Sequence, residues 1–365
     1  MLKVFEKGGK LYWLHSTVDA FETFLAVPPT VTKKGAHVRD SIDLKRIVII
    51  ALIAAIPAAL FGMWNVGYQH SLTLGNHGID ILANFWYGFL HVLPLYIVTY
   101  VVGLFIEFGT AQIRGEEVNE GFLMTGFLIP LIVPVTTPLW MVGLATAFSV
   151  IFCKEVFGGT GMNIWNPALV ARAFLFFSYP NQMSGSACWI SKPGADAVTG
   201  ATPLALDGPA QYGTDFWSCF IGTIPGSVGE TSTICILLGA ILLLWTGVAS
   251  WKIMAGSVIG ALAVGFIGTA TGITTVPCYM QLVLGGFAFG TVFMATDPVT
   301  SCQTEGGKWI YGLLIGMLCI TVRLFNPGYA EGMMLAILLA NTLAPIIDHC
   351  IVSAHISRKN KQIPA

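Results

Sequence analysis

Long apolar runs, separated by short polar segments, occupy most of the chain after residue 45. A helix that crosses the hydrocarbon of a membrane needs roughly 20 mainly apolar residues. Runs close to this length predict ten membrane-spanning helices. The predicted spans are 46–64, 85–108, 121–134, 138–153, 164–179, 232–250, 252–271, 278–296, 309–325 and 328–350. The pattern therefore predicts an all-α polytopic membrane protein.

Polar segments divide these spans into two groups. Residues 1–45 form an amphipathic arm without the short apolar core of a cleavable signal. Residues 180–231 are rich in Gly, Pro and Ser, too polar to cross a membrane and too long for a simple turn. We therefore expect a first five-helix repeat over 46–179, a second over 232–350, and a polar tail over 351–365.

The composition agrees with a protein surrounded by lipid. Only 10% of the residues are charged and 55% are hydrophobic, whereas soluble domains carry roughly 25% charged residues. The net charge of −1 argues against a nucleic-acid partner, which would need a basic surface. The eight cysteines include no pair at C-x-x-C spacing, so neither an iron–sulfur cluster nor a zinc site is expected.

Lysine and arginine are distributed unevenly between the predicted loops. Eight of the 18 lie at or before the start of the first span, and with the N-terminus inside, seven more fall at inner loops or in the tail. Only Lys192 falls in an outer loop. Because basic residues favour the cytoplasmic side, both termini are predicted to be cytoplasmic, with 180–231 outside.

A shift of 169 residues aligns two stretches of the chain. Residues 140–144 (WMVGL) then face 309–313 (WIYGL), and Lys154 faces Arg323. The predicted topology puts Lys154 at the inner face and Arg323 at the outer face, so the two repeats are inverted. Inverted five-helix repeats are typical of transporters, whose sites lie where helices break near the middle of the membrane.

Such breaks are visible in the sequence. The span 121–134 is short and ends among prolines, and Asp297–Pro298 ends its counterpart in the second half. The fifth span follows a Gly158–Gly161 turn, Asn163 and Asn166–Pro167. Asn before Pro is typical of a helix N-cap with Pro in the first turn. Irregular backbone at this depth persists only where it lines a cavity or packs on protein. A functional site is expected here, and a capped helix start without a ligand is the alternative.

The outer segment contains the sequence TGATPL at 199–204. Taken alone it is typical of a turn. Pro203 favours extended backbone at Thr202, and Gly200 and Ala201 leave room beside the Thr202 hydroxyl. Such a hydroxyl permits a phosphoester to a cofactor but does not require one.

Many stretches together resemble the B subunit of the sodium-translocating NADH:quinone reductases. They are HVRDSIDLKRI (37–47), EVNEGF (117–122), KEVFGGTG (154–161), NPAL (166–169), RAFLFF (172–177), TGATPL (199–204), IPGSVGE (224–230), LVLGGFAFG (282–290), FMATDP (293–298), EGMMLAILLAN (331–341) and DH (348–349). The D subunit of the Rnf ferredoxin-linked pumps represents a sister family that shares the S/T-G-A-T box. The N-terminal arm favours the quinone reductase, and the resemblance covers nearly the whole chain.

The resemblance implies two flavins. Thr202 would carry FMN through a phosphoester on its side-chain oxygen. Asn163 and Asn166 would hold a non-covalent riboflavin near the cytoplasmic side, since amide groups can pair with the donor–acceptor edge of the flavin ring. Arg172, inside the fifth span, is expected either to contact a flavin oxygen or to form a structural ion pair.

The resemblance also implies a sodium pathway through Glu107, Asp297 and Asp348, and a quinone site near Gly103 and the N-terminal arm. Ionisable groups in or beside apolar spans are costly and usually functional, and carboxylates suit a hard cation. The alternatives are a snorkelling interfacial acid for Glu107, a helix cap for Asp297, and a solvated helix-end group for Asp348.

No G-x-G-x-x-G follows a predicted strand, so NADH must be oxidised elsewhere in a larger complex. The resemblance implies these partners: an FMN-bearing C-like subunit, D- and E-like membrane subunits, an NADH-oxidising F-like subunit with FAD and a 2Fe–2S cluster, quinone, and a flavin transferase. It places the complex in the bacterial inner membrane, with electrons passing from FMN through riboflavin to quinone and Na+ exported. An Rnf-type subunit and a cofactor-free inverted-repeat transporter are the competing interpretations.

Overall fold

A computed structural model describes most of the apolar part of the chain. It describes residues 44–75, 80–115, 121–183, 202–204, 215–326 and 331–362, together with 18, 32, 34–36, 118 and 189. Most of the predicted arm and of the segment 180–231 lies outside the described residues, as do Thr199, Gly200 and Ala201.

Every regular element in the described ranges is helical. The α-helices are α2 (Leu44–Thr73), α3 (Ile81–Arg114), α4 (Phe122–Ile132), α5 (Leu139–Ser149), α6 (Pro167–Ser178), α7 (Pro180–Met183), α9 (Phe216–Ile221), α10 (Thr233–Trp245), α11 (Trp251–Ala270), α12 (Met280–Val283), α13 (Phe287–Phe289), α14 (Glu305–Phe325) and α15 (Met333–Gln362). Two π-helical segments, η3 (Val150–Lys154) and η5 (Gly290–Met294), and a 3-10 turn, η4 (Glu155–Phe157), complete the set.

Six helices are long and apolar enough to cross a membrane, which agrees with a multi-pass protein. They are Leu44–Thr73, Ile81–Arg114, Leu139–Phe157, Trp251–Ala270, Glu305–Phe325 and Met333–Asn360. Three further apolar helices, α4, α6 and α10, are shorter than a full span. The count of ten spans and the inverted repeat therefore stay predictions.

Two predicted spans differ from the helices that the structure shows. The span 278–296 is not one helix but α12, α13 and η5 in succession. The reason is local: Gly285 has φ +60°, a left-handed conformation that interrupts a helix and that other residues rarely adopt. The last helix, α15, continues to Gln362, well past the predicted end at residue 350.

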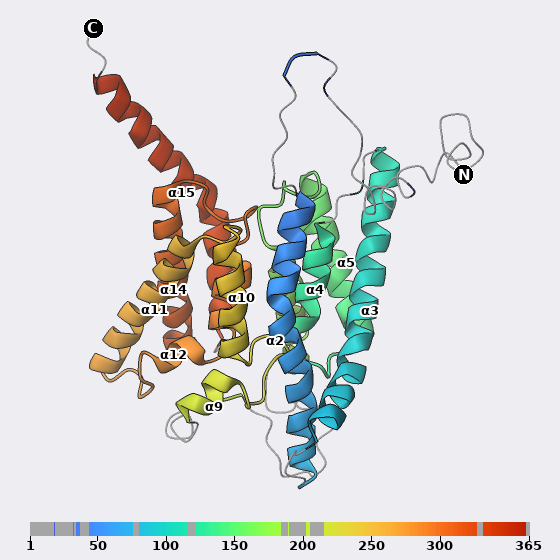
Figure 1. The fold of residues 1–365 in the computed structure, drawn as a ribbon. Coiled ribbons are helices and arrows are strands. Elements are labelled where there is room, and N and C mark those ends of the chain that lie inside the picture. Colours follow the sequence, from blue (N-terminus) through green and yellow to red (C-terminus); the bar gives the residue numbers. More distant parts are fainter. Residues whose placement is uncertain are drawn as a thin grey trace, which may run out of the picture.

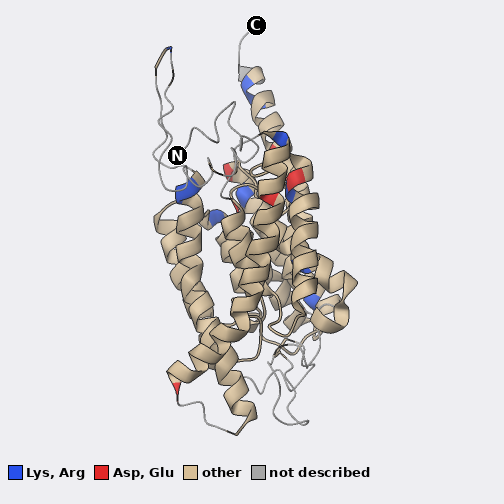
Figure 2. Cartoon of the chain, turned by 90° about the vertical axis from the view of Figure 1, so that its right-hand side faces the viewer, with Lys and Arg blue, Asp and Glu red and all other residues tan. Residues whose placement is uncertain are grey.

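The long helices run roughly parallel to one axis, so each has one end at either face of the bundle (Figure 1). We call the end at which α2 begins and α15 ends the basic end. Most lysines and arginines of the described helices gather there (Figure 2). They stand at the helix termini on that side: Lys45, Arg46, Arg114, Lys154, Lys252, Lys308, Arg358 and Lys359. This asymmetry is the one that the charge count predicted; the direction of the bundle in a membrane stays a prediction.

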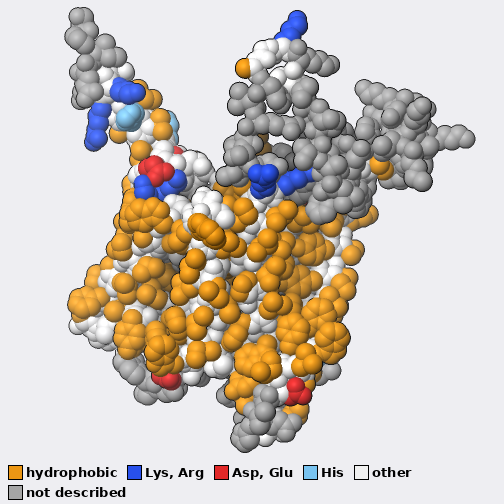
Figure 3. All heavy atoms as spheres, in the orientation of Figure 1, with side chains coloured by type: hydrophobic (Ala, Val, Ile, Leu, Met, Phe, Trp, Pro, Cys, Tyr) orange, Lys and Arg blue, Asp and Glu red, His pale blue; other side chains and the backbone are white. Residues whose placement is uncertain are grey.

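Between the two ends the surface is apolar (Figure 3). Phe105 and Trp245 expose 79% and 85% of their surfaces. A soluble monomer rarely exposes so many large apolar side chains in one continuous surface, whereas a surface in contact with lipid does. Inside, glycines bring helices together: a Cβ added at Gly260 of α11 would lie 2.5 Å from the carbonyl oxygen of Leu313 in α14. Small residues at such seams let helix backbones approach closely in membranes.

Candidate functional site

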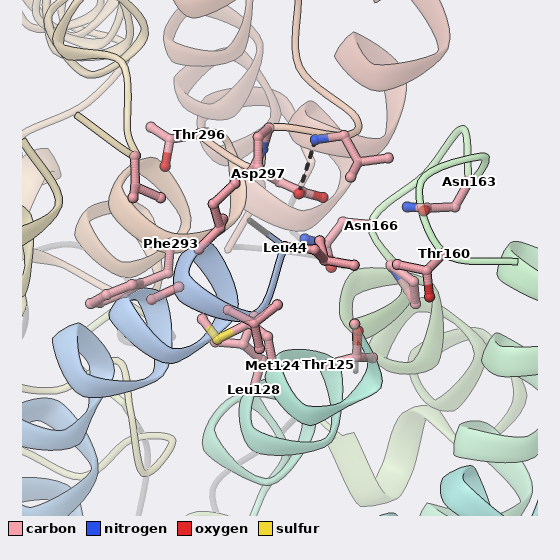
Figure 4. Close-up of a pocket in the computed structure, with 18 of the residues that line it drawn as sticks. Leu44, Met124, Thr125, Leu128, Thr160, Asn163, Asn166, Phe293, Thr296 and Asp297 are labelled. Carbon is pink, nitrogen blue, oxygen red and sulfur yellow. Dashed lines mark hydrogen bonds between the residues drawn. The ribbon is translucent and has the colours of Figure 1, made fainter. Parts of the chain in front are cut away.

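An open cavity of about 860 Å³ lies toward the basic end of the bundle. We call it the asparagine cavity. Its walls come from α2, α4, the loop before α6, the end of α10 and the segment after η5; they include Leu44, Met124, Thr125, Leu128, Lys154, Thr160, Asn163, Asn166, Phe293, Thr296 and Asp297 (Figure 4).

Two wall residues, Lys154 and Phe293, belong to the two π-helical segments. A π turn widens a helix locally and is common at functional sites. The predicted breaks in both halves of the chain therefore meet at one cavity.

Asn163 and Asn166, predicted to act together, both line this cavity. Nδ2 of Asn163 donates to the carbonyl oxygen of Trp165 at 3.0 Å. Oδ1 of Asn166 accepts from the backbone N–H of Ala168 at 3.0 Å, and Pro167 follows in the first turn, which confirms the predicted N-cap of α6. Among the described residues, Oδ1 of Asn163 and Nδ2 of Asn166 have no partner, so the cavity offers one acceptor and one donor from these amides.

Asp297 lines the same cavity and also closes a local turn. Its carboxylate accepts from the backbone N–H of Val299 at 3.2 Å and from Thr300 Oγ1 at 3.0 Å. Burial raises the pKa of the Asp297 carboxyl above its ordinary value, and these two hydrogen bonds oppose the rise. These contacts close a turn, and the next helix begins only at Glu305, so the alternative of a helix cap is wrong. The predicted sodium role of Asp297 stays a prediction.

Glu107 forms a buried ion pair with Lys154. Oε1 of Glu107 accepts from Lys154 Nζ, and the two side chains are only 4% and 5% exposed. The alternative of a snorkelling interfacial acid is therefore wrong. A second, smaller cavity of about 330 Å³ adjoins the pair and is also lined by Arg114, Glu155 and Thr160; we call it the glutamate cavity. Lys154 and Thr160 line both cavities.

Asp348 lies away from these cavities, in α15. It accepts from the backbone N–H groups of Gln303 at 2.7 Å and Thr304 at 3.0 Å, and from the Thr304 hydroxyl. It thereby ties the start of α14 to α15. The alternative of a solvated helix-end group is wrong, because Asp348 lies in the interior of α15 and accepts hydrogen bonds from the backbone N–H groups before α14.

Gly103 packs against α4 and does not line either cavity. A Cβ added there would lie 1.8 Å from Cζ of Phe122, whose ring is fully buried. Phe122 follows Gly121 and precedes Met124, both of which line the asparagine cavity. Gly103 thus sets the position of a ring directly behind one cavity wall.

Arg172 does not line the asparagine cavity, although it shares α6 with Asn166. Its guanidinium pairs with Glu230 at 2.5 Å and with Glu331. Ser227 Oγ donates to the second oxygen of Glu230 at 2.5 Å. The structural ion pair that the sequence left open is confirmed, and the pocket gives no support to a flavin contact of Arg172.

Thr202, Pro203 and Leu204 are described at the end of the bundle opposite the basic end. Leu204 packs against the apolar cluster of Cys219, Ile224, Val276, Met280, Val283 and Leu284, around α9 and α12 (Figure 1). A Cβ added at Gly285 would lie 2.7 Å from Leu204 Cδ2. Thr202 itself is half-buried. The two predicted flavin sites therefore lie toward opposite ends of the helical bundle.

Three ionisable residues of these sites were not predicted to be functional: Lys154, Glu230 and Glu331. The sequence did distinguish Lys154, because a lysine directly follows the apolar segment 138–153. It entered the sequence analysis only as a basic residue that indicates the cytoplasmic side. Glu230 and Glu331 lie 58 and 159 residues from their partner Arg172, and nothing in the local sequence identifies such a pairing. Within the described residues, no three His, Cys, Asp or Glu side chains form a group that could hold a metal ion.

Comparison with known proteins gives similarity over nearly the whole chain. The family described as "NQR2, RnfD, RnfE family" matches residues 31–357. A relative from Chromohalobacter salexigens is 46% identical over 389 residues, covering 98% of this chain and 94% of the relative. Relatives from Stutzerimonas stutzeri and Pseudomonas aeruginosa are each 45% identical, covering 97% of this chain and 96% of each relative. All three are named as the B subunit of Na(+)-translocating NADH-quinone reductase.

Proposed function

The chain belongs to the NQR2, RnfD, RnfE family, as the B-type subunit of Na(+)-translocating NADH-quinone reductase, and we propose that it is the membrane flavoprotein of a sodium-pumping complex. It carries electrons from a covalent FMN through riboflavin to quinone, and the transfer drives Na+ export. The placement of the two candidate flavin sites toward opposite ends of the bundle is the observation that carries this proposal. Such a placement suits electron transfer across the membrane.

The FMN is joined to Thr202 by a phosphoester on Oγ1. The support is the half-buried Thr202 before Pro203 and the packing of Leu204 on Gly285, which anchors the attachment point to the bundle. Arg323 holds the underlying loop, with its guanidinium donating to the carbonyl oxygens of Gln281 at 2.6 Å and Leu284 at 2.9 Å. The chain thus provides a fixed platform, and the flavin supplies the redox chemistry.

Riboflavin occupies the asparagine cavity. The proposal rests on the mixed apolar and polar lining of the cavity and on the Asn163 oxygen and Asn166 nitrogen that have no partner among the described residues. Leu44, Met124 and Phe293 give the cavity apolar walls against which a flavin ring would pack. Arg172 is left out of this site, because its guanidinium is engaged by two carboxylates.

Sodium enters from the basic end, with Glu107 as the first acidic residue in its path. Glu107 is buried beside a small polar cavity, and Asp297 lies in the wall of the neighbouring one. Asp348 acts less directly, by holding the turn between Asp297 and α14. Quinone is reduced at the same end, near the ring that Gly103 positions and beside the N-terminal arm.

The basic end faces the cytoplasm of a bacterial cell, so both termini are inside and Thr202 is outside. This orientation follows the positive-inside rule applied to the helix termini. The chain works with a C-like FMN subunit, D- and E-like membrane subunits and an F-like NADH-oxidising subunit with FAD and a 2Fe–2S cluster. A flavin transferase attaches the FMN.

In-gel fluorescence of the denatured complex tests the covalent flavin. A fluorescent band at the size of this chain is expected in the wild type and is expected to disappear in Thr202→Val, while Thr223→Val, a threonine in the same outer region, keeps it. A wild-type band without fluorescence, from cells that contain the flavin transferase, overturns the proposal.

The sodium path has a separate test. Glu107→Gln should raise the Na+ concentration that half-saturates quinone reduction while the fluorescence at Thr202 is retained. An unchanged Na+ dependence removes Glu107 from the path. Inhibition by quinone analogues separates this function from that of an Rnf-type subunit, which the matching family also includes.

A further inference from the structure

The buried ammonium of Lys154 pairs with Glu107, the carboxylate that the proposed function assigns to sodium binding. We propose that Lys154 is a tethered cation that competes with Na+ for Glu107 and couples Na+ binding to negative charge in the asparagine cavity. This inference rests on the proposed function and adds a residue to it. Lys154 acts as a positioning residue: its ammonium moves between the two cavities, and the residue takes part in no covalent or redox step.

The geometry of the pair carries the competition. Lys154 Nζ donates to Oε1 of Glu107, and both side chains are almost fully enclosed. An ammonium and a sodium ion are both monovalent cations that bind carboxylate oxygen. A buried carboxylate needs one such partner, since an unpaired buried charge is strongly unfavourable. It follows that Na+ reaches the carboxylate of Glu107 only as Lys154 leaves it.

Lys154 has a second place to go. It lines the asparagine cavity as well as the glutamate cavity, and Thr160 lines both beside it. Glu155, which also lines the glutamate cavity, already pairs with Arg114 at 3.2 Å, so its charge is partly compensated. The asparagine cavity holds Asp297 in its wall, so a displaced ammonium meets a carboxyl oxygen there.

The backbone around Lys154 is built to allow a change. Lys154 is the last residue of the π segment η3, and the chain passes at once into the 3-10 turn η4. Gly158, Gly159 and Gly161 follow with φ of +117°, +95° and +91°. A π turn followed by a tighter helix lacks the uniform hydrogen-bond ladder that fixes a residue within a regular α-helix.

The charges balance through the exchange. One negative charge arrives in the asparagine cavity as an electron, the Lys154 ammonium moves toward it, and one Na+ replaces the ammonium on Glu107. Each cavity then has the same net charge as before. The electron comes from the proposed flavin chain, and no further reactant is needed.

Opposite substitutions at this position test the competition in the purified whole complex. Lys154→Met removes the competitor, so the Na+ concentration for half-saturation should fall by about tenfold or more, the usual worth of a charge-assisted hydrogen bond. Lys154→Arg keeps the positive charge and can hold a carboxylate through two parallel N–H groups, so half-saturation should need more Na+. The measurements are equilibrium binding of radioactive sodium to the oxidised complex and the Na+ dependence of quinone reduction.

Lys252→Met is the matched control. Lys252 belongs to the same basic end and pairs with a carboxylate at 2.5 Å, but that partner, Glu305, is 66% exposed. Its replacement should leave Na+ half-saturation unchanged, since exposed ion pairs contribute little. If Lys154→Met fails to assemble, the double variant Lys154→Met/Glu107→Gln, which removes both buried charges, should assemble and show weak Na+ binding.

Unchanged Na+ half-saturation in both Lys154→Met and Lys154→Arg overturns the inference. If only Lys154→Arg assembles, its unchanged half-saturation has the same consequence. These outcomes differ from a failure of the proposed function, in which the wild-type complex itself would lack flavin on Thr202 or Na+-dependent quinone reduction.

Discussion

Replacing Gly103 by alanine tests how tightly α3 and α4 are joined behind the asparagine cavity. The added Cβ would lie 1.8, 2.3 and 2.5 Å from Cζ, Cε1 and Cε2 of Phe122. The ring has no room to retreat: it is fully buried and meets Tyr100 edge-on with ring centroids 6.1 Å apart. Alanine at this position therefore forces the ring or the helix to move.

Two effects of opposite sign set the magnitude. Ala in place of Gly in a helix interior is favourable by about 1 kcal/mol. Overpacking a filled interior costs about 1–3 kcal/mol. Gly103→Ala is therefore expected to lower the free energy of unfolding by up to about 2 kcal/mol. Gly109→Ala, on the same helix with nothing within 4 Å of its added Cβ, should be neutral or stabilising by up to about 1 kcal/mol.

Thermal unfolding of the two purified variants in the same detergent measures this difference. Because Phe122 lies in α4 next to residues that line the cavity, Gly103→Ala should also raise the KM for quinone, with covalent flavin content unchanged. Gly109→Ala should leave this KM unaltered. If the two variants unfold at the same temperature and share the wild-type KM, the packing argument and the quinone assignment of Gly103 are both refuted.

Three further predictions concern an ion pair, a capping carboxylate and an amide. Arg172→Met should lower the free energy of unfolding by at least about 3–5 kcal/mol, because Glu230 is left buried without its cation. Thermal unfolding should show a large loss of stability that Arg172→Lys partly restores, and equal losses in the two variants contradict the pairing. Asp348→Ala removes the acceptor for the Thr304 N–H and should lower the free energy of unfolding by about 1 kcal/mol. Asp348→Asn keeps an acceptor oxygen and should keep most of the wild-type stability. An alanine variant as stable as the wild type rules out the capping role. Asn163→Leu should lower the content of extractable riboflavin without changing covalent flavin, and unchanged riboflavin removes Asn163 from that site.

The helical framework was largely predictable, because each apolar run carries its own signal. The N-cap of α6 is a local feature, and Asn166–Pro167 specified it from two residues. The span 278–296 was predicted as one helix because its apolar residues continue across Gly285. The left-handed backbone of Gly285 interrupts the helix there, and hydrophobicity alone does not show this. Likewise, α15 continues beyond the apolar run because a polar sequence with good helix formers can extend an existing helix.

The candidate site was less predictable, because its chemistry depends on contacts between distant segments. Asn163 and Asn166 lie close in sequence, and their shared place at one cavity was foreseen. The pairing of Lys154 with Glu107 joins residues 47 apart, and Arg172 with Glu331 joins residues 159 apart. A single sequence shows that each buried charge needs a partner but not which one, and this is why a flavin contact and an ion pair are both alternatives for Arg172 at the level of the sequence.

The central claim is the covalent flavin on the outer segment, and mass spectrometry of a protease digest of the intact complex tests it most directly. The account predicts that the peptide containing Thr202 carries the mass of FMN joined with loss of water, with fragment ions assigning it to Thr202. The same peptide at its unmodified mass, from a complex that still reduces quinone in response to Na+, would contradict the account.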